Sequence, residues 1–452
     1  MTESSNASAY ASLAAVGRQC QQLGIWPLIA QHVCIKQKVR VHTPQDKLLD
    51  CFLNILAGGH GLVEINTRVR ADPALQRAFG RRGCAEQSTI SDTLNACTAE
   101  NVTQLRHALD CLWRQHSQTA RHDYAHRWQL FDIDMTGLRA GRQGEGVSKG
   151  YFAQHKNARG RQLGRVLASH YDEIICERLY PGKRQLESSL LALVDATAAT
   201  LKLRPKQRQN TLLRIDGGGG SDANLNALLA RQYQVLVKVH NWQRARKLAE
   251  TVTDWFTDAK VPERQIGWVR QPHVYAQATQ QVAIRKPKPH GRWAYSVIVC
   301  NVSDAVLADL LRAPATAPPS ARDRAEWIVH AYDLRGGGAE TQIKADKQGL
   351  GLAQRNKRSF VAQEMLVLLA QLAHNLTIWT RNALAVAAPR LAPYGIQRMV
   401  RDVYRIPGAV RFDAVGHVHV TLSAHHPLAA AVVAGFRNWH LGDQLSVNLG
   451  KI

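Results

Sequence analysis

The chain has 452 residues, and its 58 Lys and Arg against 35 Asp and Glu give a formal net charge of +23 at pH 7. Hydrophobic residues make up 45% and charged residues 21% of the chain, a balance that is typical of folded proteins and excludes a disordered one. A positive charge of this size attracts polyanions, and nucleic acid or an anionic membrane surface is the usual partner.

The sequence carries no sign of a membrane segment. No run of apolar residues is long enough to span a bilayer, and residues 1–6 do not begin a signal peptide. We therefore expect a soluble cytoplasmic protein without a membrane partner. The eight cysteines form no CxxC pair, which predicts reduced core thiols rather than disulfides or a zinc site.

Residues 1 to about 125 are predicted to be mainly helical. Segments 46–57 and 102–113 carry apolar residues at helical spacing. Between them, segment 87–95 supplies hydroxyl and amide side chains that can cap a helix. This segment is either the start of a DNA-reading helix or a well-capped turn, and the preceding Arg81 and Arg82 favour phosphate contact.

From residue 127 the apolar residues alternate as they do in strands. This order of strands and helices indicates an α/β sheet, in which catalytic groups tend to lie at the carboxyl ends of the strands. The predicted elements are strands over 130–134, 151–155, 163–169 and 173–179, a helix over 186–203, a strand over 211–215, a helix over 223–231 and a strand over 233–240.

A second alternating stretch, 265–302, predicts a β-rich insert after this first part. Its loop at 285–292 is rich in Arg, Lys and Pro, and we expect this basic tip to contact DNA. Trp242 and Trp293 either belong to the core or stack on an extruded base. The Ala- and Pro-rich segment 313–320 is the clearest linker.

The segment that follows the linker places one carboxylate among cations. If the chain is helical from Ala339 onward, Glu340, Lys344 and Lys347 share one helix face. The remaining residues predict a long buried helix over 360–381, a hairpin over 410–414 and 417–421, and a last helix over 428–439.

Aspartates stand at or near the ends of two predicted strands. Asp132 and Asp134 point to the same face of the first strand because side chains alternate, so geometry alone does not choose between them. Asp216 ends an apolar strand, whereas Asp222 lies beyond four glycines. No Gly-Lys-Ser/Thr follows those glycines, so we do not expect a nucleotide-binding loop.

The acidic residues and their neighbours resemble the DDE transposases of bacterial insertion sequences. Around Glu340, the chain reads Tyr332, two residues, Arg335, four residues, Glu340, six residues and Lys347, which resembles the Tyr-Arg-Glu-Lys signature of that family. The family usually has three residues where this chain has four between Arg335 and Glu340. The resemblance covers roughly residues 130–381.

The resemblance implies an α/β fold with an RNase H-like catalytic core that a β-rich insert interrupts, preceded by an N-terminal helical domain. The order of the predicted elements agrees with such a core. The expected parts are a helical DNA-binding region over 1–125, the core over 126–245 and 325–400, the insert and linker over 246–324, and a hairpin and helix over 401–452.

The resemblance also implies a set of site residues. Three carboxylates can hold two Mg²⁺ ions, for which Mn²⁺ can substitute, and such ions serve phosphoryl transfer. In the family the first carboxylate lies shortly before a Thr, which favours Asp134 because Thr136 follows it. The predicted residues are the catalytic and metal-binding Asp134, Asp216 and Glu340 and the DNA-binding Tyr332, Arg335, Lys344 and Lys347.

By this resemblance the chain is a transposase that binds the inverted-repeat ends of its own element, cleaves them and joins the 3′ hydroxyls to target DNA. Its partner is double-stranded DNA, and two ends in one complex imply a homodimer. One alternative is a structure-selective nuclease with the same core. The other is a non-catalytic DNA-binding protein that derives from a transposase.

Overall fold

The chain folds into two compact units, each of which is built from separate stretches of the sequence. The computed structural model describes residues 7–150, 152, 155, 157–313, 318–439 and 444–451. The first unit comprises Met1–Ser117, Leu138–Ser148 and Gln342–Ile452, and the second comprises Gln118–Gly137 and Lys149–Thr341. This division is coarser than the predicted one into five segments, which stays a prediction.

The first unit is mainly helical, as predicted for residues 1–125. Thr43 and Asp46 form a capping box that begins α3, and Thr98 and Asn101 form one that begins α6. Its helices before residue 118 are α1 (Ala11–Gln22), α2 (Ile25–His32), α3 (Pro44–Leu56), η1 (Ile65–Val69), α4 (Pro73–Ala78), α5 (Gln87–Ala96) and α6 (Ala99–His116). Segment 87–95 is therefore a helix.

The C-terminal part of the first unit contains the long buried helix α14 (Phe360–Ala385), which agrees with the predicted one. The predicted hairpin is also present, and the strands β1 and β14 extend it into a four-stranded sheet in the order β1, β12, β13, β14. The elements here are η5 (Pro389–Leu391), α15 (Ile396–Arg398), η6 (Met399–Val403), β12 (Gly408–Phe412), β13 (Val418–Ser423), α16 (Ala429–Asn438) and β14 (Leu445–Gly450), with β1 at Ala7–Ser8.

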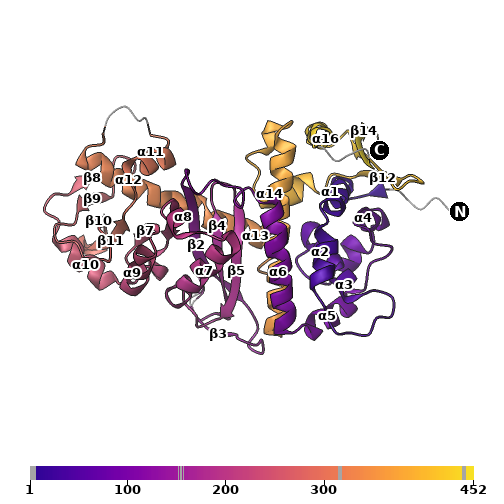
Figure 1. Ribbon diagram of the computed structural model, residues 1–452, viewed down its shortest axis with the longest axis horizontal. Helices are drawn as coiled ribbons and strands as arrows, with labels where there is room; N and C mark the ends of the chain where they lie inside the picture. Colours follow the sequence, from indigo (N-terminus) through magenta and orange to yellow (C-terminus); the bar gives the residue numbers. More distant parts are fainter. Residues whose placement is uncertain are drawn as a thin grey trace. The chain divides into compact units, whose positions relative to one another are not determined.

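The second unit is built on one large mixed sheet. Along this sheet β4 is followed by β2, β6, β7, β11, β10, β9 and β8, while β5 and β3 pair with β4 (Figure 1). The strands are β2 (Gln129–Arg139), β3 (Ser148–Lys149), β4 (Arg159–Ala168), β5 (Glu173–Pro181), β6 (Thr211–Ile215), β7 (Gln234–Lys238), β8 (Phe256–Thr257), β9 (Gln265–Trp268), β10 (Gln280–Pro287) and β11 (Trp293–Cys300).

Helices cover both faces of this sheet. On one face α7 packs across β4 and β5, α9 packs on β7, and α10 packs on β10 and β11 (Figure 1). On the other face α12 packs on β7, β9, β10 and β11. The helices of the second unit are α7 (Leu186–Leu201), α8 (Pro205–Arg208), η2 (Gly217–Gly219), α9 (Asp222–Ala230), α10 (Trp242–Glu250), η3 (Pro289–Gly291), α11 (Asp304–Leu311), α12 (Ala321–Asp333) and η4 (Leu334–Gly337). Helix α13 (Ala339–Gly349) begins in this unit, and its residues from Gln342 onward belong to the first.

The β-rich segment after β7 does not fold as a separate sheet. Its strand β11 pairs antiparallel with β7, and β10 and β9 follow it, so the insert lengthens the sheet of the first part. Pairing with β11 covers an edge of β7 that would otherwise expose unpaired backbone groups. The predicted insert and linker over 246–324 also contain α11, the second half of α10 and the first turn of α12, which the alternating pattern did not predict.

Two predicted segments fall wholly or partly on undescribed residues. Of the strand predicted over 151–155, residues 151, 153 and 154 lie outside the described residues, and so do residues 314–317 of the predicted linker. Among the residues that the structure describes, no helix combines the length and hydropathy needed to cross a membrane.

Candidate active site

The register of three parallel strands aligns the predicted aspartates. Ile133 of β2 pairs with Ile215 of β6, and Ile215 pairs with Val237 of β7. The residues that follow these three in the sequence are Asp134, Asp216 and Lys238. Because neighbouring strands lie about 4.8 Å apart, these three residues form a row across the carboxyl ends of the strands.

The row faces the side of the sheet that α12 covers. Leu130, Leu212 and Leu236 belong to one apolar cluster with residues of α12 such as Ile328 and Val329. Side chains along a strand alternate between faces, so the residues two and four positions after each of these leucines face the same way. The strand aspartates therefore meet the segment that carries the predicted glutamate.

Asp132, the alternative first carboxylate, forms a buried ion pair with Arg214. It accepts hydrogen bonds from Arg214 at 2.6 Å and 2.7 Å and from the Ser169 hydroxyl at 2.5 Å, and its side chain is fully buried. Arg214 also donates to the carbonyl of Ala331 at 2.8 Å, near the end of α12. This pair anchors α12 to the strands, and it leaves Asp134 as the aspartate of β2 that is available for chemistry.

A break between two helices brings Arg335 to the aspartates. After α12 the chain forms the short 3₁₀ helix η4, which carries Arg335, and α13 begins at Ala339. Gly338 lies against the buried pair, because a Cβ there would stand 2.5 Å from the carboxylate of Asp132. Ala339 is buried against Leu167 and Ile174 of β4 and β5, which fixes where α13 starts.

The guanidinium of Arg335 contacts all three predicted carboxylates. Its Nη2 lies 2.8 Å from Asp134 Oδ1, and its Nη1 lies 2.6 Å from Glu340 Oε1 and 3.8 Å from Asp216 Oδ1. The Arg335 side chain is 7% exposed, whereas those of Asp216 and Glu340 are about half exposed. The structure thus gathers residues from β2, the end of β6 and the start of α13 around one cation.

The five-residue step from Arg335 to Glu340 is accommodated by this break. The 3₁₀ turn and the non-helical Gly338 absorb the residue by which the chain exceeds the family spacing. Thr341 stabilises the turn, since its hydroxyl donates to the carbonyl of Gly336 at 2.7 Å. The longer gap therefore does not separate Arg335 from the glutamate.

The environment of Asp134 disfavours its negative charge. Burial raises the pKa of Asp134 from 3.8 to about 6; the Arg335 cation and the N–H of Met135 oppose this rise, and Asp216 and Glu340 add to it. Three carboxylates against one guanidinium leave two negative charges in excess when all are ionised. The carboxylate oxygens are the donor type that a hard divalent cation such as Mg²⁺ or Mn²⁺ prefers, and the Arg335 guanidinium occupies the space among them.

Tyr332 contributes a hydrogen bond to the same cluster. Its hydroxyl donates to Asp216 Oδ1 at 3.3 Å. Burial, followed by the charge of Asp216, raises the pKa of Tyr332 above its ordinary value, so the phenol keeps its proton and remains a donor. For Arg335, burial acts to lower the pKa, but Asp134 and Asp216 outweigh it and raise the pKa.

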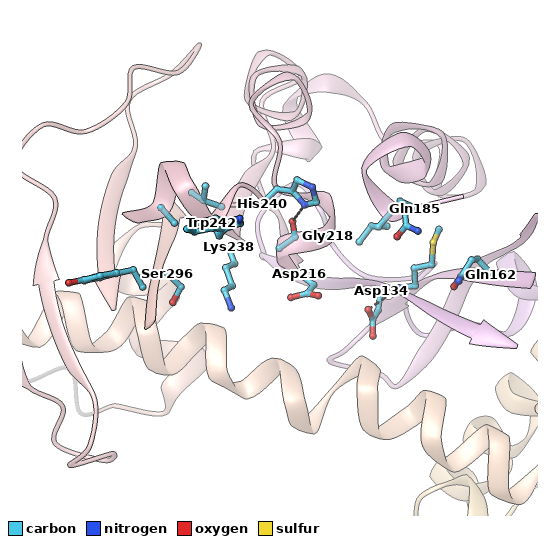
Figure 2. Close-up of a pocket in the computed structure, with 15 residues that line it drawn as sticks. Asp134, Gln162, Gln185, Asp216, Gly218, Lys238, His240, Trp242 and Ser296 are labelled. Carbon is cyan, nitrogen blue, oxygen red and sulfur yellow. Dashed lines mark hydrogen bonds between the residues drawn. The ribbon is translucent and has the colours of Figure 1, made fainter. Parts of the chain in front are cut away.

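A pocket of about 460 Å³ opens beside the aspartates. Figure 2 shows Asp134, Asp216 and Lys238 on its wall, with the two carboxylates and the amine pointing to the same side. Lys238 is a candidate site residue that our sequence reasoning missed. Its position at the end of the third parallel strand is the signal that could have revealed it.

The glycines after Asp216 form a tight turn rather than a phosphate loop. Gly220 lies so close to β7 that a Cβ would stand 2.0 Å from the carbonyl of Lys238. The ring of His240 donates from Nδ1 to the carbonyl of Gly217 at 2.8 Å and holds the turn (Figure 2). Asp222 lies in the first turn of α9 and pairs with Arg244 instead of joining the cluster.

A second pocket, of about 550 Å³, combines basic and aromatic side chains and shares Trp242 and Tyr295 with the first. Trp242 is 67% and Trp293 37% exposed, so neither is a core residue. The guanidinium of Arg285 lies between the rings of Trp255 and Trp293, 4.4 Å and 4.5 Å from their centroids. Arg285 and Trp255 lie outside the pocket lining, which consists of Trp242, Arg246, Lys288, Arg292, Trp293, Ala294 and Tyr295.

Lys344 and Lys347 lie on α13 together with Glu340, as predicted. Both follow Thr341 and therefore belong to the residues of the first unit. Lys344 is exposed and Lys347 is half-buried. Their predicted role in DNA binding stays a prediction.

Comparison with known proteins decides the family. A family model described as transposase DDE domain group 1 matches residues 6–439, nearly the whole chain. The chain belongs to this transposase family. DDE transposases generally use divalent metal ions, which agrees with the acidic cluster, and their family suggests an enzyme that cleaves and transfers DNA.

Comparisons of this DDE family member with curated proteins and with solved structures do not narrow its function further. No curated protein matches its sequence. Among solved structures it is similar to a piggyBac transposase, in a cryo-EM structure of the synaptic complex with hairpin DNA. The identity is 12% and the TM-score 0.48, over 84% of this chain and 78% of that one. A likeness at this level carries no conclusion about this chain.

Proposed function

We propose that the protein is a DNA transposase that binds the inverted-repeat ends of its own element, cleaves them and joins the 3′ hydroxyls to target DNA. The contact of Arg335 with Asp134, Asp216 and Glu340 is the observation that carries this proposal. These carboxylates lie far apart in the sequence. The Asp, Asp and Glu that the sequence predicted all contact the same guanidinium.

The strand arrangement supports an RNase H-like core. In the order β5, β4, β2, β6, β7, the outer pair β4 and β5 is antiparallel, whereas β2, β6 and β7 are parallel. The first aspartate lies on the central strand and the second follows its parallel neighbour. The strands β8–β11 then form the insert, and α12 and α13 bring the chain back to the core.

Asp134, Asp216 and Glu340 would hold two Mg²⁺ ions, for which Mn²⁺ can substitute. The chemistry that such ions supply is activation of the attacking oxygen and stabilisation of the leaving one. Tyr332 orients the carboxylate of Asp216, and Arg335 holds the three carboxylates together by offsetting part of their repulsion. Arg335 thus acts first as a positioning residue, and its contact with DNA remains the family's implication.

DNA would approach the first pocket from the side where Lys238 and the second, basic and aromatic pocket lie. Lys288 and Arg292 supply charge for phosphates, and Trp242 and Trp293 present exposed rings on which bases can stack. The helical residues 1–125 would bind the element ends. Joining two ends requires at least a homodimer in the DNA complex, and the reaction would take place in the cytoplasm of a bacterial cell.

Lys238→Ala is expected to weaken DNA binding without changing the fold. If Lys238 contacts one phosphate, its loss reduces the slope of log affinity against log salt by about 0.9. The measurement is a titration of labelled duplex DNA at several salt concentrations. Lys206→Ala is the matched control, because Lys206 is an exposed lysine of α8, which precedes β6 and so lies at the opposite end of that strand from Asp216. Equal slopes for the two variants would contradict the role of Lys238.

A linear DNA with the sequences that flank the gene on both sides, incubated with the protein, Mg²⁺ and a target plasmid, tests the reaction itself. We expect cuts at the element ends and joined products in the plasmid. A structure-selective nuclease would give cuts without joining. A chelator should stop both steps, and Mg²⁺ or Mn²⁺ should restore them.

Glu340→Gln separates an enzyme from a non-catalytic DNA-binding protein. We expect it to reduce cleavage by about 10³-fold, the scale on which a group that acts in the transition state is measured, while DNA binding persists. Glu263→Gln is the control, since Glu263 is an exposed glutamate of the same unit. If both variants keep the biological activity of the protein, the non-catalytic alternative is correct.

A further inference from the structure

Two helices of the first unit bring three soft side chains together. His32 is the last residue of α2, and His107 and Cys111 lie four residues apart on α6, so they share a face of that helix. The ligand atoms of the three side chains all lie within 4.8 Å of one another. Cys111 Sγ and His107 Nε2 are 3.8 Å apart, and the His32 and His107 rings meet edge to face with centroids at 4.9 Å.

Two side chains of α6 form hydrogen bonds with the backbone of Cys34, just after His32. The amide of Asn101 donates to the carbonyl of Cys34 at 2.7 Å, and the N–H of Cys34 donates to the Gln104 side chain at 2.9 Å. These bonds hold the chain just after His32 to the two helical turns that precede His107. The cluster is therefore preorganised by the fold rather than by a chance meeting of mobile side chains.

The geometry is close to that of a tetrahedral metal site. With metal–nitrogen bonds of about 2.0 Å and metal–sulfur bonds of about 2.3 Å, ligand atoms lie roughly 3.3 to 3.8 Å apart. The Cys111–His107 pair is already in this range, and rotamer adjustments of the order of an ångström bring His32 into it. Arg114 donates to the same sulfur at 3.7 Å, which holds the thiol on this face of α6.

The residue types select the ion. Two imidazoles and a thiolate suit Zn²⁺, whereas Mg²⁺ prefers the oxygen ligands of the acidic cluster. Three protein ligands leave a fourth position for water or another ligand. The cysteine is half-buried and His107 is exposed, so an ion can reach the site from solvent.

We propose that His32, His107 and Cys111 form a Zn²⁺ site that ties the end of α2 to the middle of α6. The site is distinct in residues and donor chemistry from the carboxylates of the proposed transposase centre, and it does not depend on transposase activity. Because the ion binds the folded helices and the unfolded chain has no such arrangement, it stabilises the first unit.

Cobalt substitution in the full-length protein tests the site without DNA. The protein is stripped of metal with a chelator, exchanged into buffer with excess Mg²⁺ and titrated with Co²⁺. We expect one equivalent of Co²⁺ to give a sulfur-to-cobalt charge-transfer absorption and the visible bands of tetrahedral Co²⁺, and Zn²⁺ to displace it and to raise the melting temperature. The carboxylate cluster cannot give the charge-transfer absorption because it contains no sulfur.

Variants assign the ligands. Cys111→Ser should abolish the charge-transfer absorption, and His107→Asn, a change of an exposed residue that leaves the fold intact, should lower Co²⁺ affinity by more than about tenfold. Cys34→Ser is the matched control, since Cys34 is the exposed cysteine next to the cluster but outside it. Absorption that survives Cys111→Ser, or that is lost in Cys34→Ser alone, overturns the proposal, and so does a protein that binds no Co²⁺ in the presence of Mg²⁺.

Discussion

Asp134→Asn is expected to abolish DNA cleavage and at the same time to make the protein more resistant to heat. Cleavage should fall by about 10³-fold or more, because the amide cannot replace a carboxylate that holds a cation. Stability should rise because burial makes the charge of Asp134 costly. A pKa of about 6 instead of 3.8 corresponds to at most about 3 kcal/mol at neutral pH, which the neutral amide no longer incurs.

The pH dependence of this gain follows from the sign of the shift. The folded protein binds the Asp134 proton more tightly than the unfolded chain, so ionisation of this residue destabilises the fold as pH rises from about 4 to about 6. Above that range the full cost is present, and below it both states carry the proton. The stability difference between Asp134→Asn and the parent protein should therefore be large at pH 7.5 and small near pH 4.

Thermal unfolding in the presence of a chelator at both pH values measures this difference. Asp195→Asn is the control, because the Asp195 side chain is 61% exposed and pairs with Arg231 at the surface. We expect that variant to change the melting temperature little at either pH. A less stable Asp134→Asn at pH 7.5 would show that the contact with Arg335 outweighs the cost of burial.

Asp132→Ala is expected to have the opposite effect on stability, with a large loss. Its removal leaves the guanidinium of Arg214 buried without its carboxylate partner, and breaking a buried pair in this way costs about 3–5 kcal/mol. The Ser169 hydroxyl also loses its acceptor. Because Arg214 links β6 to Ala331 of α12, the loosened pair should also displace Glu340 and reduce cleavage.

Chemical denaturation of Asp132→Ala, Arg214→Met and the double variant measures the coupling of the pair. Arg214→Met keeps an unbranched side chain but removes the charge, so the double variant should be less destabilised than the sum of the single ones. Additive losses would mean that the two side chains act independently. Asp132→Ala and Asp134→Asn, two positions apart on one strand, should therefore both reduce cleavage, but only Asp132→Ala should also reduce the stability of the fold.

The row of strand-end residues could be predicted in part. Alternation of apolar residues located the strands that carry Asp134 and Asp216, because burial of one or both faces leaves a local pattern. The choice between Asp132 and Asp134 could not be made from alternation, since both face the same side of β2. It depends on Arg214 of a neighbouring strand, and a pairing across the sheet leaves no local signal.

Other features depended on tertiary contacts in the same way. The alternating pattern gave β9, β10 and β11 but did not show that β11 pairs with β7. The helical spacing of α13 was predicted, whereas the need for glycine at 338 comes from the buried pair beneath it. The cluster of His32, His107 and Cys111 was missed because its members lie on different helices, and the absence of CxxC pairs argued against zinc.

The alignment of Ile133, Ile215 and Val237 also determines which changes in chain length the protein can tolerate. Adding or removing one residue inside β2, β6 or β7 would turn the side chain at the end of that strand to the opposite face of the sheet. A deletion of one codon there would therefore remove Asp134, Asp216 or Lys238 from the row as completely as a substitution does. Loops that join these strands can lengthen without moving the row. Linker-scanning insertions should therefore be harmful in those three strands and mild at exposed turns such as Val415 and Gly416.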